Sequence, residues 1–412
     1  MEALVWGLAG VITALILAEI VIRVAGLAPT SFYTYDRDRG WTMKANTAGW
    51  QTEEGRAYVR VNRDGFRGPD YALAKPAGTL RIAVLGDSFT EAQQVAESET
   101  FCAVAQRQIQ AAMPLEVVDG GGHTMQYNRV EVINFGCDGY GTAQELITLR
   151  ERVWRYTPDV VVLAVFTGND IRNNSVVLEG DKCRPFYVFE GQNLVLGGPF
   201  EDSFWFRTSC MLRFESRHLQ VLNLLGNARS LLTHRIRALW ASNPRVRAMT
   251  KKPRSEPGLN DEIYGPPRNA VWRDAWHITD AEIEMVEQNV AEHHARLLVV
   301  TLANGIQDDP DPIARQRYAK WLGAKNLFLP DDHIRDLGQR SGFAVLNLAA
   351  PMQRYAEEHH EYLHGFPNTR PGIGHWNANG HREAGELIAQ RLIELLQNRQ
   401  GFPPLSPSLP VD

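Results

Sequence analysis

The stretch LRIAVLGDSFT, residues 80–90, decides the fold class. Its first part, Leu80 to Leu85, is short and mostly apolar, which predicts a buried strand. Gly86 ends this strand, and a Gly-Asp-Ser turn follows at once. A serine in such a turn can project its hydroxyl from the edge of a sheet, so Ser88 is a candidate nucleophile.

The same strand-then-turn pattern recurs along the chain. Apolar strands are predicted at 132–135, 160–167, 297–301 and 344–348, and helices at 99–112, 142–156, 280–294 and 378–398. Continuous apolar strands that alternate with helices are typical of a parallel sheet covered on both faces. The sequence therefore predicts an α/β fold around a parallel five-stranded sheet.

Composition narrows the function. The chain has 412 residues, 44% hydrophobic and 22% charged, the balance of a globular protein. A net charge of −5 gives no case for nucleic-acid binding. The four cysteines form no CxxC pair, so no structural metal is expected. Cys183 and Cys210 can pair in an oxidising compartment or be two unrelated thiols.

The N-terminus predicts a membrane anchor. Residues 3–18 carry no charge, and about 20 apolar residues cross a bilayer as a helix. A cleaved signal peptide and a buried soluble helix are the alternatives. Arg23, Arg37 and Arg39 follow the segment, which by the positive-inside rule would leave the large domain in the cytoplasm.

These patterns divide the chain into five parts. The expected boundaries are a transmembrane anchor at 1–27, a strand-rich lead-in at 28–79, a sheet domain at 80–172 and 277–398, an insertion at 173–276, and a C-terminal tail at 399–412. Residues 207–254, within the insertion, hold eleven Lys or Arg and one acid. This basic amphipathic segment predicts either a helical cap on the sheet or a membrane-surface helix.

Three further motifs follow predicted strands or precede the last helix. They are NFGCDGYG at 134–141, Gly168-Asn169-Asp170, and GHWNANGH at 374–381. Ligands of open parallel sheets bind beyond the carboxyl ends of the strands, so these motifs are expected to converge. His375 can act there as a base, whereas His381 is a weaker candidate. Asn169 can donate to an oxyanion or cap a helix.

Taken in order, the four motifs resemble those of the SGNH hydrolase superfamily, also called GDSL esterases. The resemblance covers about residues 80 to 170 and 279 to 398. It implies a flavodoxin-like α/β/α sandwich, Ser88 as nucleophile and His375 as general base. It also implies an oxyanion hole formed by the Ser88 N–H, the Gly136 N–H and the Asn169 side chain.

The sequence departs from the family at one position. The family usually has an Asp two or three residues before the catalytic histidine, where this chain has Ile373 and Gly372. Either a backbone carbonyl orients the imidazole, or a distant acid such as Asp331 or Asp332 replaces the missing one. An orienting acid can contribute orders of magnitude in rate.

The expected function is that of a serine esterase, acting on a small ester or an acylated carbohydrate or lipid of the cell envelope. An O-acyltransferase of the same mechanism and a non-catalytic SGNH-like carbohydrate-binding module are the alternatives. No cofactor is expected. The absence of GxGxxG and of a Walker loop after the first strand disfavours a nucleotide-binding protein. A single-pass membrane protein with its catalytic domain outside the cytoplasm is expected.

Overall fold

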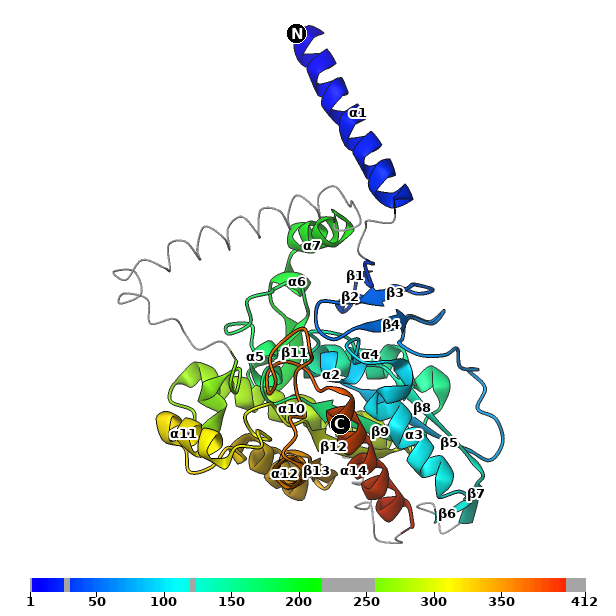
Figure 1. Ribbon diagram of the computed structural model, residues 1–412, viewed down its shortest axis with the longest axis vertical. Helices are drawn as coiled ribbons and strands as arrows, with labels where there is room; N and C mark the ends of the chain where they lie inside the picture. The colour runs from blue at the N-terminus through cyan, green and yellow to red at the C-terminus, as the bar shows by residue number, and fades with distance from the viewer. Residues whose placement is uncertain (1, 26–29, 119–123, 217–255, 398–412) are drawn as a thin grey trace.

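A computed structural model describes residues 2–25, 30–118, 124–216 and 256–397 (Figure 1). The strands are β1 (Tyr33–Asp36), β2 (Gly40–Met43), β3 (Ala48–Gln51), β4 (Ala57–Arg60), β5 (Thr79–Leu85), β6 (Leu115–Val118), β7 (Thr124–Tyr127), β8 (Arg129–Asn134), β9 (Val160–Val165), β10 (Phe186–Glu190), β11 (Asn193–Gly197), β12 (Arg296–Thr301) and β13 (Ala344–Asn347). The main helices are α1 (Glu2–Val24), α2 (Ser88–Glu91), α3 (Phe101–Ala111), α4 (Thr142–Glu151), α5 (Asp170–Asn173), α6 (Pro199–Asp202), α7 (Phe204–Ser216), α10 (Ala270–Glu292), α11 (Pro312–Leu322), α12 (Leu329–Ser341), α13 (Ala349–His359) and α14 (Ala378–Gln397).

The centre of the molecule is a five-stranded sheet in the order β13-β12-β9-β5-β8. Every pairing in it is parallel, and Val84 of β5 lies between Val162 of β9 and Asn134 of β8. Counted along the chain, the five strands therefore lie in the spatial order 2-1-3-4-5. The predicted parallel five-stranded sheet is confirmed.

Helices cover both faces of this sheet (Figure 1). Leu80, Ile82 and Val84 belong to one apolar cluster, which takes in residues of α3, α13 and α14. Ala83 and Leu85 point the other way, into a cluster with residues of α4, α10 and α12. Because both faces are buried, the strands are apolar at successive positions rather than at alternate ones.

The 28–79 lead-in forms two antiparallel hairpins, β1–β2 and β3–β4. Figure 1 shows both on the side of the body that faces α1. A third apolar cluster joins the lead-in to α7, where Phe214 stacks on Trp41 with 5.9 Å between ring centroids. It also joins the lead-in to the loop after β8, where the Tyr140 hydroxyl donates to the Trp41 carbonyl at 2.6 Å. The lead-in is thus packed against the sheet domain.

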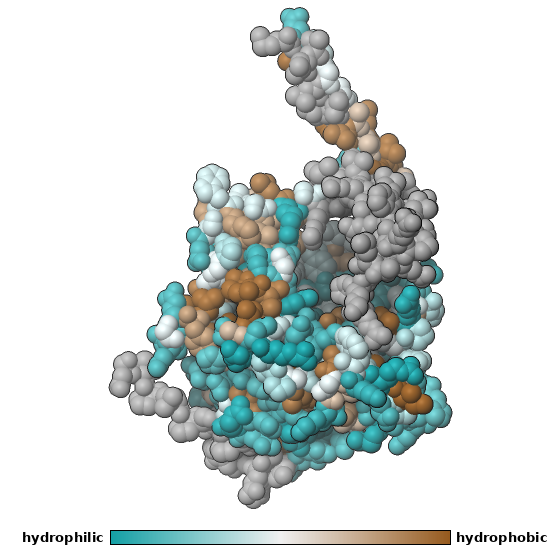
Figure 2. All heavy atoms as spheres, turned by 90° about the vertical axis from the view of Figure 1, so that its left-hand side faces the viewer, coloured by the Kyte–Doolittle hydropathy of each residue, from teal (hydrophilic) through white to brown (hydrophobic). Residues whose placement is uncertain are grey.

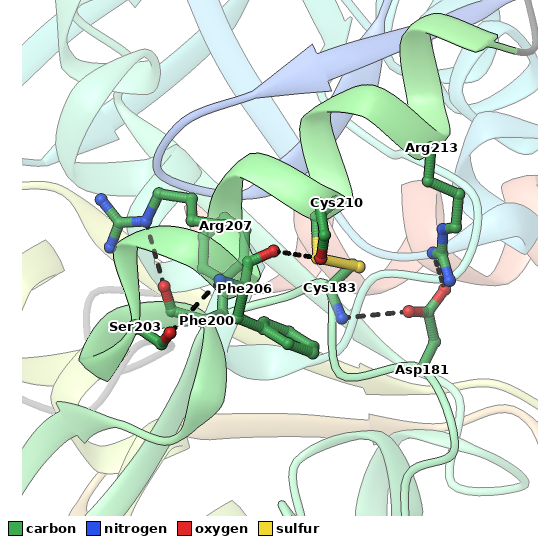
Figure 3. The surroundings of a disulfide bond; sticks show 9 residues. Asp181, Cys183, Phe200, Ser203, Phe206, Arg207, Cys210 and Arg213 are labelled. Atoms are coloured by element: carbon green, nitrogen blue, oxygen red, sulfur yellow. Dashed lines mark hydrogen bonds and ion pairs between the residues drawn. A yellow bond between two sulfur atoms is a disulfide. The ribbon is translucent and has the colours of Figure 1, made fainter.

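The described part of the insertion is held by a disulfide. Cys183 and Cys210 are bonded at 2.04 Å, and Asp181 accepts both the Cys183 N–H and the Arg213 guanidinium (Figure 3). The paired alternative is therefore the one that the structure adopts. Most of the basic segment predicted at 207–254 falls within 217–255, outside the described residues. Helix α10 begins at Ala270, inside the range predicted for the insertion.

The prediction of a membrane anchor is wrong. Helix α1 projects from the body (Figures 1 and 2). Crossing a bilayer takes about 20 consecutive apolar residues in one helix. Within residues 2–25, 30–118, 124–216 and 256–397, no helix has both the length and the apolar character that a membrane span requires. The predicted single-pass placement, and the side of the membrane inferred from it, fall with that finding.

Candidate active site

Ser88 lies where the turn after β5 becomes helix α2. The Asp87 side chain caps this helix by accepting the Phe89 N–H at 2.9 Å. Gly86 is needed for the turn, because a Cβ there would lie 2.2 Å from the Thr90 hydroxyl. Ser88 is 8% exposed. Its N–H is in the first turn of the helix, where backbone N–H groups have no partner within the helix.

His375 lies in the loop before α14 and reaches Ser88. Its Nε2 is 2.8 Å from the Ser88 Oγ, although the residues are 287 positions apart. The imidazole packs on the ring of Phe89, with 4.9 Å between ring centroids. A general base must be within hydrogen-bond reach of the proton that it takes, and this pair meets that condition.

Glu54 holds the other side of the imidazole. Its Oε2 is 2.5 Å from His375 Nδ1, and its Oε1 accepts the His375 backbone N–H at 2.8 Å. Glu54 lies in the turn between β3 and β4, within the segment predicted as a lead-in. A Cβ at Gly374 would be 2.0 Å from Glu54 Oε1, and Gly374 has a φ of +86°, so glycine is required there.

Polar contacts hold the β3–β4 turn and the His375 loop together. The Asn368 amide accepts the Gly55 N–H at 2.9 Å and donates to the carbonyls of Thr52 and Gly55 at 3.1 Å each. Behind the loop, the buried His364 bonds through Nδ1 to the Gly374 carbonyl at 2.7 Å. The position of Glu54 relative to His375 is thus fixed from both sides.

Glu54 and His375 shift each other's pKa. Burial alone lowers the pKa of His375, but the hydrogen bond and charge of Glu54 outweigh it and raise that pKa above its ordinary value of 6.5. Burial acts to raise the pKa of Glu54, whereas the hydrogen bonds and charge of His375 bring it below its ordinary value. Glu54 is therefore ionised at neutral pH and stabilises a protonated His375.

The two other predicted oxyanion donors, the Asn169 side chain and the Gly136 N–H, have different surroundings. Asn169 lines the same cleft as Ser88 and His375, and its Nδ2 donates to Asp87 at 3.3 Å. It occupies the N-cap position of α5 but makes no capping hydrogen bond, which favours the oxyanion interpretation over the capping one. The Gly136 N–H, in contrast, donates to Asn134 Oδ1 at 2.9 Å, and Gly136 does not line the cleft.

The acids predicted to orient His375 lie elsewhere. Asp331 is buried and accepts the Thr301 hydroxyl at 2.6 Å and the Gln307 amide at 2.7 Å. Asp332 pairs with Arg335 at 2.6 Å. Since Glu54 takes the Nδ1 position, the prediction of Asp331 or Asp332 there is corrected.

Sequence reasoning missed Glu54 because it is 321 positions from His375 and belongs to no motif. The sequence carries only a weak signal for the contact between Glu54 and His375. An acid next to Gly55 stands between two short alternating segments, and Gly374 directly precedes the histidine.

His381, the weaker histidine candidate, is fully buried at the start of α14 and accepts the Phe101 N–H at 3.4 Å, so it is a core residue.

The cleft around Ser88 has a volume of about 390 Å³. Phe89, Phe166 and Leu259 form its apolar wall. The carboxyl groups of Asp138 and Glu256 line it together with Glu54, and Glu256 also accepts the Gly374 N–H. In the described part of the chain, no group of three His, Cys, Asp or Glu side chains is arranged to hold a metal ion.

Comparison with known proteins gives only distant structural likenesses. No family model matches the chain, and no curated protein matches it significantly. An alpha/beta hydrolase enzyme, LAE5, from the metagenome of Lake Arreo, Spain, is 13% identical, with a TM-score of 0.36 over 79% of this chain and 100% of its own. The acetyl xylan esterase AlAXEase is also 13% identical, with a TM-score of 0.36 over 76% of this chain and 98% of its own. The acetylxylan esterase Axe2 from Geobacillus stearothermophilus is 10% identical, with a TM-score of 0.35 over 76% and 93%. Likenesses this low do not identify a reaction.

Proposed function

We propose that this protein is a serine esterase that hydrolyses carboxylic esters, with Ser88 as nucleophile, His375 as general base and Glu54 as the orienting acid. One observation supports this above all others. The Ser88 Oγ lies 2.8 Å from His375 Nε2, and the Glu54 carboxylate lies on Nδ1 of the same ring. Nucleophile, base and a third group that orients the base form the arrangement that activates a serine.

The reaction proceeds in two halves. His375 Nε2 takes the Ser88 proton as the Oγ attacks the ester carbonyl, and the tetrahedral intermediate collapses when His375 gives that proton to the departing alcohol. Ser88 then carries the acyl group as an ester. Water, deprotonated by His375, attacks this ester, and the acid leaves as the proton returns to Ser88.

The oxyanion of each tetrahedral intermediate is stabilised by donors at the same edge of the sheet. The proposed donors are the Ser88 N–H, at the first turn of α2, and the Asn169 side-chain amide. The Gly136 N–H is left out, since Asn134 already accepts it. Fixed donors aimed at a developing negative charge supply several kcal/mol of transition-state stabilisation, about 3–4 kcal/mol each in one measured case.

The cleft favours a small, uncharged acyl group. Its volume is about 390 Å³, and three carboxyl groups, those of Glu54, Asp138 and Glu256, line it. An acyl group with its own carboxylate would be repelled, whereas an acetyl group can pack on Phe89 and Phe166. The 2-1-3-4-5 strand order is that of flavodoxin-like sheets and supports membership of the SGNH group.

The contact of Glu54 with His375 helps to weigh two alternatives to an esterase, a non-catalytic module and an acyltransferase. A non-catalytic module gained support only from the missing acid, and Glu54 supplies an acid at the required atom. An acyltransferase would use the same groups and differ only in the acceptor of the acyl group. Adding an alcohol acceptor to the assay and measuring transesterification against free acid separates these two outcomes.

The test is hydrolysis of p-nitrophenyl acetate by the full chain. Ser88→Ala and His375→Ala should each abolish turnover above the rate of the uncatalysed reaction. Ser341→Ala is the matched control, because the Ser341 hydroxyl bonds Glu284 on the far helices α12 and α10. Wild-type activity in the Ser88→Ala variant would refute the proposal.

A further inference from the structure

A second cavity lies on the other side of the β3–β4 turn. Its volume is about 570 Å³, larger than that of the cleft around Ser88. Its walls come from the turn itself, from the segment after α2, from the loop before His375 and from the start of α14. Among the residues that line it are Thr52, Arg56, Gln94, Phe366, Asn368 and Asn377.

An exposed aromatic pair adjoins this cavity. Trp50 and Tyr58 face each other across the β3–β4 hairpin, with their ring centroids 5.6 Å apart. They are 54% and 53% exposed. The Arg56 guanidinium lies 5.0 Å from the centroid of the Trp50 ring and also lines the cavity. Arg56 therefore links the ring pair to the cavity.

We infer that the cavity and the ring pair bind a neutral carbohydrate chain, so that the alcohol part of the ester substrate is a sugar. The C–H face of a pyranose ring is apolar and packs on an aromatic face, while its hydroxyls project around the rim. Gln94 lines the cavity, and its amide oxygen has no hydrogen-bond partner among the residues that the structure describes. The amides of Asn368 and Asn377 already bond the backbone around them and give the wall its shape. Arg56 adds five N–H donors. This inference rests on the proposed function, because it names the substrate class of that site.

Charge selects a neutral chain over a polyanion. Glu99 lines the cavity, and Glu97 pairs with Arg60 at 3.7 Å on the same side of the hairpin. Binding of a nucleic acid needs a surplus of Lys and Arg against its phosphates, and the acids here cancel that surplus. An acyl chain would require a continuous apolar groove, whereas this cavity carries amide, carboxylate and guanidinium groups.

The cavity and the catalytic groups share the same supports. Gly55 lines the cavity and directly follows Glu54, the partner of His375. Asn368 lines the cavity and also bonds Gly55 and Thr52. A sugar chain bound here would lie against the turn whose other side faces Ser88. A long substrate can thus gain affinity from the hairpin while its ester lies in the cleft.

The experiment separates binding from catalysis. The full chain with Ser88→Ala is titrated with neutral xylo-, cello-, manno- and chito-oligosaccharides of two to six units, by calorimetry and by tryptophan fluorescence. We expect saturable binding of at least one series that tightens with chain length. Trp50→Ala should weaken it about tenfold, the loss that one stacking ring carries. Trp205→Ala, at a 79% exposed position on α7, is the matched control and should leave binding unchanged.

Activity gives a second, independent measurement. In the otherwise wild-type chain, Trp50→Ala should raise KM for an acetylated oligosaccharide, whereas the control Trp205→Ala should leave that KM unchanged. No binding of any series, or binding that Trp50→Ala does not weaken, overturns the inference. So does binding of an acidic uronate oligomer alone. None of these outcomes affects the proposed esterase, which is tested separately by hydrolysis of the aryl ester and its loss in Ser88→Ala.

Discussion

Replacing Glu54 with Gln should trap His375 in the wrong tautomer. The carboxylate now accepts both the His375 backbone N–H, at 2.8 Å, and the ring Nδ1–H, at 2.5 Å. An amide has one acceptor and one donor. If the amide oxygen keeps the backbone N–H, its NH₂ faces Nδ1, which must then accept. The proton moves to Nε2, where it blocks transfer from Ser88.

The size of this effect follows from the same geometry. An Asp to Asn change beside the histidine of a serine protease lowers kcat about 10⁴-fold by the same loss of tautomer. We expect Glu54→Gln to lower kcat/KM by about 10³–10⁴-fold, which corresponds to about 4–5.5 kcal/mol of transition-state stabilisation. Glu53→Gln, at the neighbouring exposed position, and Asp332→Asn are matched controls and should stay near wild type.

The pH dependence of the same variant gives a second measurement. Activity needs neutral His375, and the pKa of His375 is raised, so the wild-type rate should fall on acidification from above pH 6.5. In Glu54→Gln the hydrogen bond and charge that raise this pKa most are gone, while burial and the weaker effects of Asp138 and Asp87 remain, so the acid limb should move to lower pH. The reasoning is refuted if p-nitrophenyl acetate is hydrolysed within threefold of wild type and with an unshifted acid limb.

Three further changes test other parts of the account. Gly374→Ala should lower kcat/KM at least tenfold, because its Cβ would lie 2.0 Å from Glu54 Oε1, and unchanged activity in a folded variant would contradict this. Asn169→Ala should lower kcat by about 10²–10³-fold with little change in KM, as for loss of an oxyanion donor, whereas a change in KM alone would indicate a binding role. Replacing Cys183 and Cys210 with Ala should lower the free energy of unfolding by about 3–4 kcal/mol, since the bond closes a loop of 27 positions, and an unchanged Tm would show that the bond does not stabilise the fold.

The sheet could be predicted because its signals are local. Each strand is a short apolar run that ends at a turn, and the predicted stretch at 80–85 agrees with β5 to one residue. Sequence order does not give spatial order, however. The position of β5 between β8 and β9, which brings the turns after all three strands to one edge, comes from the pairing of backbones far apart in the chain.

The candidate site was only partly predictable, for the same reason. Ser88 and His375 stand in motifs, but Glu54 acts through a contact between a hairpin and a loop that no short pattern encodes. Gly136 shows that a motif does not by itself determine a contact. It stands in a motif, yet Asn134, two residues earlier, accepts its N–H in a local turn. The anchor was inferred from a long, uncharged apolar run, and the described helices do not bear it out.

The central claim is that Ser88 is an activated nucleophile, and the most direct test is covalent labelling of the full chain with a fluorophosphonate. We predict one adduct, mapped by peptide mass spectrometry to Ser88, whose rate of formation falls in Glu54→Gln and vanishes in His375→Ala. An adduct on a different serine, or hydrolysis of p-nitrophenyl acetate that continues at full rate with Ser88 fully labelled, would contradict the claim.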